Sequence, residues 1–327
     1  MPSTLKNIAV FTSGGDAPGM NAAIRAVVRT AIHEDINVFG IYRGYYGMIH
    51  DEFKALDSFS VANIIQRGGT ILKSARSEEF RTAEGRALAI QNLRKHKIDA
   101  IVAIGGNGTY AGAQLLGEES GIPIVGLPGT IDNDIYGTDF TIGYDTALNN
   151  AVNAIDKIRD TADAHERVFF VEVMGRDSGF IGLNVGMAVG AESILIPEIY
   201  DDKEKLLEYF KSKNTRQKLF SIVIVTEGNK EGNALDLAEE VRTNFPYLDI
   251  RVSILGHIQR GGSPTAGDRL LASKLGYEAV MQLKQGNRGK ALGYRKGELS
   301  QTPFQDAIQE YDHLDKNLWK VARVLSL

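Results

Sequence analysis

The stretch IAVFTSGGDAPGM, residues 8–20, combines a short apolar run, a glycine-rich turn and the start of a helical pattern. The run lacks polar alternation, which is typical of a strand covered on both faces in a parallel sheet. Glycines let a ligand approach the backbone, and a helix N-terminus offers N–H groups to phosphate oxygens. The segment is neither a Walker A loop nor a full dinucleotide fingerprint, so by itself a plain strand-to-helix turn is the simpler interpretation.

The same alternation of apolar runs and helical stripes continues along the chain. Further runs occupy 36–41, 101–104 and 122–127, and a second set, after a helix predicted at about 145–160, occupies 168–173, 194–196, 220–225 and 250–255. This order predicts an α/β fold of two doubly wound (Rossmann-like) three-layer α/β/α domains with mainly parallel sheets. The change of block falls near Asp139, and the charged stretch 201–218 predicts a solvated helix and loop.

Composition excludes several classes of protein. The chain has 327 residues, 43% hydrophobic and 24% charged, with a net charge of −4, as in ordinary globular proteins. A pI near 5.9 gives no basic footprint for nucleic acid. The absence of cysteine excludes disulfides, thiolate metal sites and a cysteine nucleophile. We see no signal peptide, and the weakly polar stretch 179–191 is too short for a membrane span, so we expect a cytoplasmic protein.

Two more segments concentrate chemistry at predicted strand ends. GGNGT at 105–109 forms a second glycine loop before a helical run, and PGTIDND at 128–134 carries two carboxylates. Residues two apart in an extended segment face the same side, which would aim Asp132 and Asp134 into one cleft. One carboxylate could accept a hydroxyl proton while the other helps to hold a divalent cation. Turn capping by Asp and Asn remains an equal alternative.

Arginines supply positive charge near these segments. Any one of them is most simply a surface salt-bridge partner, but several at strand ends would suit phosphorylated ligands, because guanidinium binds phosphate bidentately. The candidates are Arg76, Arg81, Arg86, Arg167, Arg176, Arg251 and Arg260. His257 could hydrogen-bond a phosphate or cap a turn.

Taken in order, these motifs resemble the bacterial ATP-dependent 6-phosphofructokinase family. The resemblance runs from about Ile8 to Tyr277 and rests on TSGGDAPGMN (12–21), PGTIDND (128–134), VEVMGR (171–176) and LGHIQRGGSP (255–264). It implies transfer of a phosphoryl group from ATP to the 1-hydroxyl of fructose 6-phosphate, the committed step of glycolysis. We expect an ATP-binding domain of residues 1–139 plus about 257–305, and a fructose 6-phosphate-binding domain of 140–256 plus about 306–327.

The resemblance also implies roles for individual residues. Asp132 would be the general base, and Thr130, Arg76 and Arg176 would stabilise the transferring phosphoryl group. The ATP site would be lined by Gly14, Tyr45, Arg76, Ser77, Gly106, Asn107, Gly108 and Thr109. The sugar phosphate would be held by Thr130, Asp132, Met174, Gly175, Arg176, Glu227, His257 and Arg260, with Arg167 and Arg251 from a neighbouring subunit. The last point implies a homotetramer with shared active sites.

Departures from the family pattern concern the metal and the donor. The family usually has Asp where this chain has Asn107, so we expect Asn107 and Asp134 to bind Mg²⁺ more weakly, together with the ATP phosphates. Pyrophosphate-using relatives typically carry Asp and Lys in place of Gly108 and Gly129, which predicts ATP as the donor. Ser77 stands where relatives often have an aromatic residue.

A regulatory site for ADP or phosphoenolpyruvate, between subunits, is also implied. The matching residues are Arg25, Arg29, Arg159, Gly190, Glu192 and Lys218, with Arg216 in place of a lysine. Ser58 replaces a common arginine, which predicts blunted allostery. Two alternatives stay open: a catalytically weak regulatory subunit that binds nucleotide and sugar phosphate, and a related kinase with another donor such as pyrophosphate.

Overall fold

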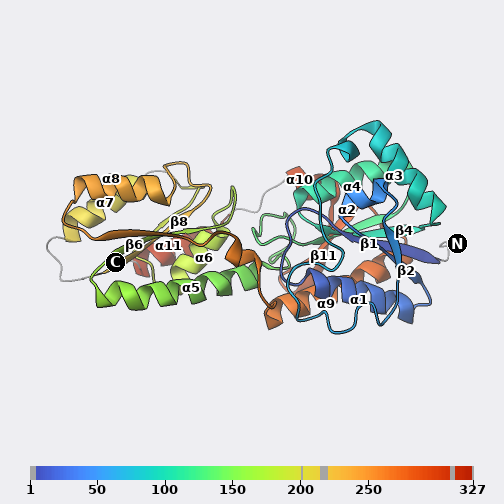
Figure 1. Cartoon of the computed structure of the whole chain (residues 1–327), viewed down its shortest axis with the longest axis horizontal. Coiled ribbons are helices and arrows are strands. Elements are labelled where there is room, and N and C mark those ends of the chain that lie inside the picture. The colour runs from blue at the N-terminus through green and yellow to red at the C-terminus, as the bar shows by residue number, and fades with distance from the viewer. Residues whose placement is uncertain (1–4, 200–201, 214–219, 310–313, 326–327) are drawn as a thin grey trace. The chain divides into compact units, whose positions relative to one another are not determined.

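The computed structural model describes residues 5–199, 202–213, 220–309 and 314–325. It divides into two compact units: the first comprises Met1–Thr146 and Arg260–Asp312, and the second comprises Ala147–Gln259 and His313–Leu327 (Figure 1). Among the described helices, none is both long and apolar enough to cross a bilayer.

Within its described residues, the first unit holds a seven-stranded sheet in the order β11-β10-β5-β4-β1-β2-β3. The central strands are parallel, while β3 and β11 are antiparallel edge strands. The strands are β1 (Asn7–Thr12), β2 (Asn37–Ile41), β3 (Phe53–Leu56), β4 (Ala100–Gly105), β5 (Ile124–Pro128), β10 (Lys290–Arg295) and β11 (Glu298–Pro303).

Helices cover both faces of this sheet (Figure 1). One layer contains α1 (Met20–His33) and α9 (Ala266–Lys284). The other contains α2 (Gly44–Ile49), α3 (Ala83–Lys95), α4 (Asn107–Ser120) and α10 (Phe304–Gln309), with the short helix η1 (Glu79–Arg81). Gly276 lies where α9 meets α1. A Cβ at this position would stand 2.6 Å from the Cβ of Ala26, so glycine allows the two helices to pack closely.

The strand order reverses between β1 and β4. From β1 the chain continues to β2 on one side, whereas from β4 it continues to β5 on the other. In open α/β sheets, ligands bind outside the carboxyl ends of the strands at such a switch point. The loops that follow β1 and β4 are the two glycine loops singled out in the sequence.

The second unit has, among its described residues, a four-stranded parallel sheet in the order β7-β8-β6-β9. Its strands are β6 (Val168–Val173), β7 (Ser193–Leu195), β8 (Ser221–Thr226) and β9 (Ile250–Ile254). The helices α7 (Asp202–Lys213) and α8 (Ala234–Asn244) lie on one face. On the other lie α5 (Tyr144–Ala164), which begins in the first unit, α6 (Phe180–Ala188) and α11 (Lys316–Leu325) (Figure 1). The short helix η2 (Gly256–Arg260) follows β9.

The predicted fold class is confirmed, with some differences in its parts. Sequence patterns did not indicate β3, β10 and β11, which carry polar or half-exposed residues. The stretch 201–218 does contain α7, but the prediction that this helix is solvated is wrong for one face, because Leu206 and Phe210 are buried in the core.

The helix α11 carries Trp319, the chain's single tryptophan. Trp319 is half-buried, and α11 packs on α6.

Candidate active site

The loop after β1 turns through residues in the left-handed region. Gly14 has φ +82° and Gly19 has φ +112°, conformations that favour glycine. The Ser13 amide donates to the Ile104 carbonyl at 3.0 Å, which joins this loop to the end of β4. Ser74 donates its hydroxyl to the Gly14 carbonyl at 2.5 Å, so a third segment of the chain fixes the same turn.

The loop after β4 places unsatisfied polar atoms at a helix start. A Cβ on Gly105 would collide with the Thr109 hydroxyl and with the Ser13 carbonyl, so only glycine fits. The helix α4 begins at Asn107 without a side-chain cap. Within the described part of the chain, the buried Oδ1 of Asn107 and Oγ1 of Thr109 have no hydrogen-bond partner. Buried polar atoms of this kind are rare, and here they lie in the first turn of a helix, as at an anion or nucleotide site.

The segment after β5 holds two of the four predicted catalytic side chains close together. Thr130 and Asp132 are 8% and 6% exposed. The Asp132 amide donates to the Thr130 hydroxyl at 3.2 Å, and this hydroxyl lies 3.4 Å from Oδ2 of Asp132. The structure therefore sets a carboxylate and a hydroxyl side by side at the carboxyl end of a central strand.

The alternation argument for Asp132 and Asp134 was wrong. Asn133 has φ +55°, so the segment between them is a left-handed turn and not an extended strand. Asn133 accepts from the Thr141 amide at 2.8 Å and donates to the Asp139 carbonyl at 3.1 Å, which locks this turn. Asp132 is buried and Asp134 half-buried.

Arg260 reaches this carboxylate from another part of the first unit. Its Nη2 lies 3.9 Å from Oδ2 of Asp132, and its Nη1 donates to the Asp16 carbonyl at 3.3 Å. One guanidinium thus spans the first glycine loop and the buried carboxylate. Sequence reasoning assigned Arg260 to the sugar phosphate and gave no signal for its contact with Asp132.

Tyr45 is a buried support beneath the second glycine loop. Its hydroxyl donates to the Thr109 carbonyl at 2.5 Å, and its ring stacks on Phe80 at 4.1 Å. Burial raises the pKa of Tyr45 well above its ordinary value, so the phenol stays a proton donor. This stacking connects the second glycine loop to the segment that carries Arg76 and Ser77.

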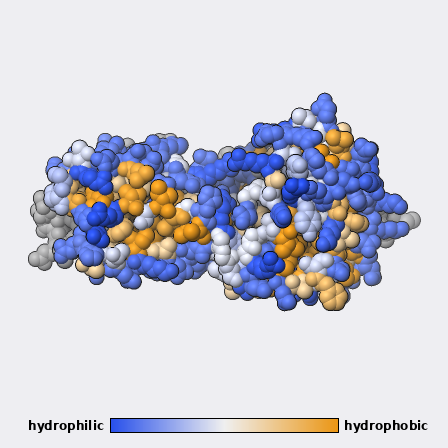
Figure 2. All heavy atoms as spheres, in the orientation of Figure 1, coloured by the Kyte–Doolittle hydropathy of each residue, from blue (hydrophilic) through white to orange (hydrophobic). Residues whose placement is uncertain are grey.

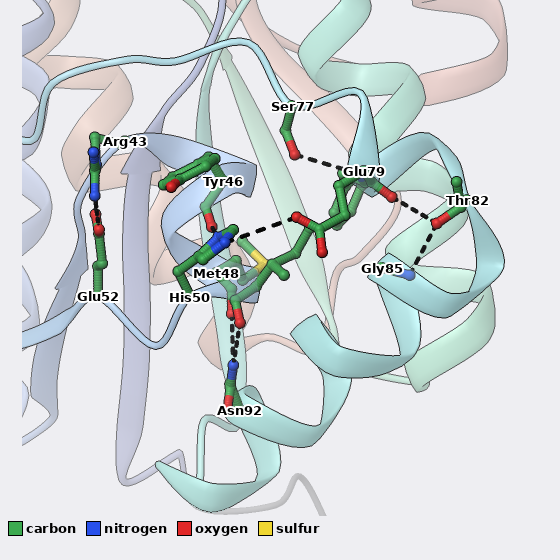
Figure 3. A network of polar contacts seen from close by, with 12 residues as sticks. Arg43, Tyr46, Met48, His50, Glu52, Ser77, Glu79, Thr82, Gly85 and Asn92 are labelled. Atoms are coloured by element: carbon green, nitrogen blue, oxygen red, sulfur yellow. Dashed lines mark hydrogen bonds and ion pairs between the residues drawn. The ribbon is translucent and has the colours of Figure 1, made fainter.

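Figure 3 shows how the segment carrying Ser77 is fixed. The Ser77 hydroxyl accepts from the Phe80 amide at 3.2 Å. Glu79 faces His50 at 3.8 Å, and the His50 ring stacks on Tyr46 of α2. Arg76, one residue before Ser77, is exposed. Glu79 therefore links the end of this segment to His50, next to α2, while Arg76 stays exposed and accessible to a ligand.

In the second unit, the predicted sugar-phosphate residues gather at the carboxyl ends of β6 and β8. Gly175 has φ +146° and Arg176 has φ +53°, so the chain turns sharply after Met174. The Arg176 amide donates to Oε1 of Glu227 at 2.8 Å. A Cβ on Gly228 would collide with the Arg176 carbonyl, which explains the glycine after Glu227. The Arg176 side chain itself is exposed.

Two polar residues that the sequence did not assign shape this edge. Gln259 is fully buried, and its Oε1 accepts from the Met174 amide at 3.3 Å. Glu198 accepts from the Gly179 amide at 2.8 Å, and desolvation raises the pKa of its carboxyl. A lone buried glutamine produces no periodic signal; only its place inside LGHIQRGGSP could have drawn attention to it.

Arg167 and Arg251 lie at the opposite edge of this sheet. Arg167 precedes β6 and Arg251 is the second residue of β9, paired with Phe169. Both bind Asp249, at 2.8 Å and 3.1 Å, and the Arg167 hydrogen bond is the main cause that holds the Asp249 pKa below its usual range. A six-residue strand spans about 20 Å, so these arginines are not brought to Arg176 within one chain. His257 is exposed on η2.

The predicted effector residues occur in both units. Arg25 and Arg29 lie on α1, and burial followed by the Arg29 charge lowers the Arg25 pKa. In the second unit, Arg159 donates to the carbonyls of Val189 and Gly190 and lies over Phe220.

The other effector candidates offer less to a ligand. Glu192 is buried and accepts from the Ile222 amide at 2.6 Å. Arg216 and Lys218 lie outside the described residues. Ser58 is exposed on the first unit.

Asn107 and Asp134 are the candidate metal ligands. Across the described ranges, no three His, Cys, Asp or Glu side chains gather as a metal cluster. Mg²⁺ needs few protein ligands when substrate phosphates supply the others. The orphaned amide oxygen of Asn107 and the carboxylate of Asp134 are hard oxygen donors, so this set fits a magnesium–nucleotide complex.

A cavity of about 500 Å³ in the first unit lies away from this site. It opens beside the end of α4 and the starts of β5 and β10, and is lined by residues such as Ile124, Arg288 and Phe304. None of the predicted site residues lines it. The cavity is thus separate from the candidate active site.

Comparisons with known proteins agree with this arrangement. The phosphofructokinase family model matches residues 7–283. The ATP-dependent 6-phosphofructokinase 2 of Bacteroides thetaiotaomicron is 52% identical over 99% of both chains. The ATP-dependent 6-phosphofructokinase 1 of Thermus thermophilus is 54% identical over 99% of this chain and 100% of that protein.

Solved structures give the same result for the fold. Phosphofructokinase from Saccharomyces cerevisiae superposes with a TM-score of 0.87 at 36% identity, over 98% of this chain and 46% of that longer chain. The pyrophosphate-dependent phosphofructokinase of Marinobacter aquaeolei has a TM-score of 0.83 at 24% identity, over 96% of this chain and 86% of that chain, a likeness of fold alone.

Proposed function

The chain belongs to the phosphofructokinase family, and we propose that it transfers a phosphoryl group from ATP to fructose 6-phosphate. The reaction gives fructose 1,6-bisphosphate and ADP, the committed step of glycolysis. The observation that carries the residue assignment is the buried Asp132 carboxylate, which lies beside the Thr130 hydroxyl and the Arg260 guanidinium at the end of β5.

Asp132 acts as the general base in this proposal. Its carboxylate takes the proton of the sugar 1-hydroxyl as that oxygen bonds to the γ-phosphorus and the bond to the β,γ-bridging oxygen breaks. ADP leaves with the electron pair of that bond. Burial supports the role, because the surrounding protein holds the Asp132 carboxylate in place. Proton transfer to a positioned carboxylate accelerates such a step by about 10²- to 10⁴-fold.

Thr130, Arg76 and Arg176 stabilise the phosphoryl group in transit. Catalysis of this reaction is mainly positioning and electrostatic stabilisation, because charge spreads over three oxygens in the transition state. The exposure of Arg76 and Arg176 supports the assignment, since neither guanidinium is buried away from ligand. Bound Mg²⁺ supplies further positive charge to the ATP phosphates, and Asn107 and Asp134 would hold it.

The proposed division of labour follows the two units. The first unit binds ATP with the loops around Gly14 and at 106–109, together with Tyr45, Arg76 and Ser77. The second binds the sugar phosphate with Met174, Gly175, Arg176 and Glu227, joined by His257 and Arg260.

An active site shared between subunits would explain where Arg167 and Arg251 lie. They lie at the wrong edge to serve their own chain, so we assign them to the sugar phosphate of a neighbouring subunit in a homotetramer. Figure 2 shows hydrophobic side chains gathered on one face of the second unit. The exposed apolar residues of this unit include Ile254 and Ile258, which are 54% and 60% exposed. Apolar patches of this kind mark protein interfaces.

ATP is the donor in this proposal. A Cβ on Gly108 would meet nothing within 4 Å, so the loop leaves room for the α-phosphate. A Cβ on Gly129 would stand 2.9 Å from Met20 Cε and 3.1 Å from Ile104 Cγ2, so a lysine cannot enter without displacing the core.

Location and regulation complete the proposal. We place the enzyme in the cytoplasm, with its glycolytic substrates. ADP or phosphoenolpyruvate binds between subunits, at the site of Arg25, Arg29, Arg159, Gly190, Glu192, Arg216 and Lys218, with a response blunted by Ser58.

The test is steady-state turnover of fructose 6-phosphate with ATP and with pyrophosphate across a magnesium titration. We expect turnover with ATP and none with pyrophosphate. Turnover with pyrophosphate alone would establish the other donor. Binding of both ligands without turnover would establish the regulatory subunit, for which the loss of a carboxylate at Asn107 is the one supporting observation.

A further inference from the structure

Thr141 is a buried polar residue to which the proposed function gives no part. It lies between Asn133 and the start of α5, and it is fully buried. Burying a hydroxyl away from water costs free energy unless the hydroxyl forms a hydrogen bond. The partners of Thr141 therefore indicate its role.

Both polar groups of Thr141 contact the segment that carries the proposed base. Its hydroxyl donates to the Thr130 carbonyl at 2.6 Å. A hydroxyl has one hydrogen to donate, so Oδ1 of Asn133, at 3.2 Å, is its weaker partner. That Asn133 oxygen accepts from the Thr141 amide at 2.8 Å. Thr141 thus holds this segment on both sides of Asp132.

The backbone next to Thr141 is itself fixed alongside β5. The Ile142 amide donates to the Pro128 carbonyl at 2.8 Å, and Ile142 pairs with Gly129 in an isolated parallel bridge. Residue 141 therefore stands in a fixed place beside the end of a central strand. From there its hydroxyl can set the orientation of the Thr130 peptide.

The position of Thr130 in turn determines where the carboxylate lies. The Thr130 hydroxyl accepts from the Asp132 amide at 3.2 Å and lies 3.4 Å from Oδ2 of Asp132. A rotation of the Thr130 peptide would therefore move the carboxylate. A displacement of about 1 Å at a reacting group can cost about a hundredfold in rate.

We propose that Thr141 is a positioning residue, whose hydroxyl acts through the Thr130 carbonyl to hold the Asp132 carboxylate where it can take the substrate proton. The kinetic consequence rests on the proposed function. The geometric part, that the Thr141 hydroxyl fixes the segment 130–133, does not depend on that function.

The experiment compares Thr141→Val, which replaces the hydroxyl by a methyl group, with Thr141→Ser, which keeps it. We expect Thr141→Val to lower kcat by about tenfold to a hundredfold and to leave KM for ATP and for fructose 6-phosphate within about threefold. Thr141→Ser should keep kcat within about threefold of the wild type. If valine prevented folding, Thr141→Ala and Thr141→Ser, which differ by one oxygen, would give the same comparison.

The control is Thr138→Val, in the same connecting segment. Thr138 is 5% exposed, and its hydroxyl donates to the Phe140 carbonyl at 2.9 Å, so the control loses a similar hydrogen bond away from Thr130. Its kcat should stay within about twofold of the wild type. An equal fall of kcat in both valine variants would overturn the inference, and so would an unchanged kcat in Thr141→Val.

A double-mutant cycle tests the route through the carboxylate. In an Asp132→Asn background, Thr141→Val should lower the residual kcat by no more than about threefold, because the group that it positions is already disabled. An equal loss in both backgrounds would mean that Thr141 acts elsewhere in the protein, which would also overturn the inference.

A further readout needs no turnover. Hydrogen–deuterium exchange, measured by mass spectrometry on peptides that span residues 128–134, reports how often this segment opens. We expect Thr141→Val to speed exchange severalfold and Thr141→Ser to leave it at the wild-type rate. Unchanged exchange in Thr141→Val would refute the contact itself. If the wild-type protein lacked the proposed kinase activity, this measurement would still test Thr141, so the two failures are distinguishable.

Discussion

Asp132 in the first unit and Arg176 in the second both follow the carboxyl end of a central strand, but their side chains are held in opposite ways. Asp132 is buried between a hydroxyl and a guanidinium of its own unit. The Arg176 side chain is 73% exposed, and its ion-pair partner Asp177 is 93% exposed. In the second unit the Arg176 backbone is held by Glu227, while the side chain is exposed to solvent.

This difference bears on the proposal that a neighbouring subunit contributes to the sugar-phosphate site. In the first unit, Arg260, Thr130 and both glycine loops meet around Asp132 without help from another subunit. In the second, Arg167 and Arg251 are bound to Asp249 at the far edge of the sheet. Under the proposed function, Asp132 is therefore a preorganised base, and Arg167 and Arg251 of a neighbouring subunit complete the sugar-phosphate site.

The strongest test of preorganisation is Asp132→Asn. The amide keeps the shape of the side chain but cannot take a proton, so kcat should fall by about 10³-fold while both KM values change less than about threefold. Steady-state kinetics in both substrates measures this. A loss confined to KM would show that Asp132 binds substrate and is not the base.

Assembly is tested by complementation between two damaged chains. Arg251→Ala alone should lower kcat/KM for fructose 6-phosphate by about a hundredfold, since a phosphate charge loses its partner. Co-expressing it with Asp132→Asn gives sites in which each subunit supplies the intact residue. With random mixing, half of the sites have an intact Asp132, and half of these are next to a chain with an intact Arg251. About a quarter of the wild-type activity should therefore return.

The matched control for complementation is each variant co-expressed with itself under a second tag. These samples should show only the residual activity of each single variant. Equal inactivity of the mixed tetramers would mean that Arg251 serves its own chain, and the contrast drawn between the two units would fail.

The nucleotide loop of the first unit is tested by Gly108→Asp. The position is open, so the variant should fold, but its carboxylate would face the ATP phosphates. KM for ATP should rise by at least about tenfold through like-charge repulsion, with KM for fructose 6-phosphate unchanged. Gly108→Ala separates volume from charge, and a loss of equal size in that variant would rule out the electrostatic reason.

The smallest effect concerns the metal. Asn107→Asp turns a neutral oxygen donor into a charged one, so the Mg²⁺ concentration for half-maximal activity should fall by about threefold to tenfold. A magnesium titration at saturating ATP measures it, and Asn107→Ala should shift the midpoint the other way. An unchanged midpoint in both variants would remove Asn107 from the metal site.

The fold was predictable where strands are buried on both faces of a sheet. Strands such as β1, β4, β6 and β8 are apolar on both faces, and that pattern is written directly in the sequence. The edge strands β3 and β11 of the first sheet escaped because solvent reaches one side of them; β11, for example, reads ELSQTP. In α7, charged neighbours concealed Leu206 and Phe210, which form the buried face.

The site was predictable in its residue types but not in its contacts. The Asn133 turn defeated the alternation argument, because a single left-handed residue rotates everything after it. The separation of Arg167 from Arg176 follows from strand direction, which appears only once the sheet is built. The contacts of Gln259 with Met174 and of Arg260 with Asp132 join residues far apart in sequence, and no local pattern encodes such pairs.

The lone indole of Trp319 gives the second unit an optical signal of its own. It lies in α11, within the second unit, and the first unit holds no tryptophan at all. Tryptophan fluorescence therefore follows unfolding of the second unit only, whereas far-ultraviolet circular dichroism follows the helices of both units. Any gap between the two melting curves would report how far one half of the chain can come apart while the other stays folded.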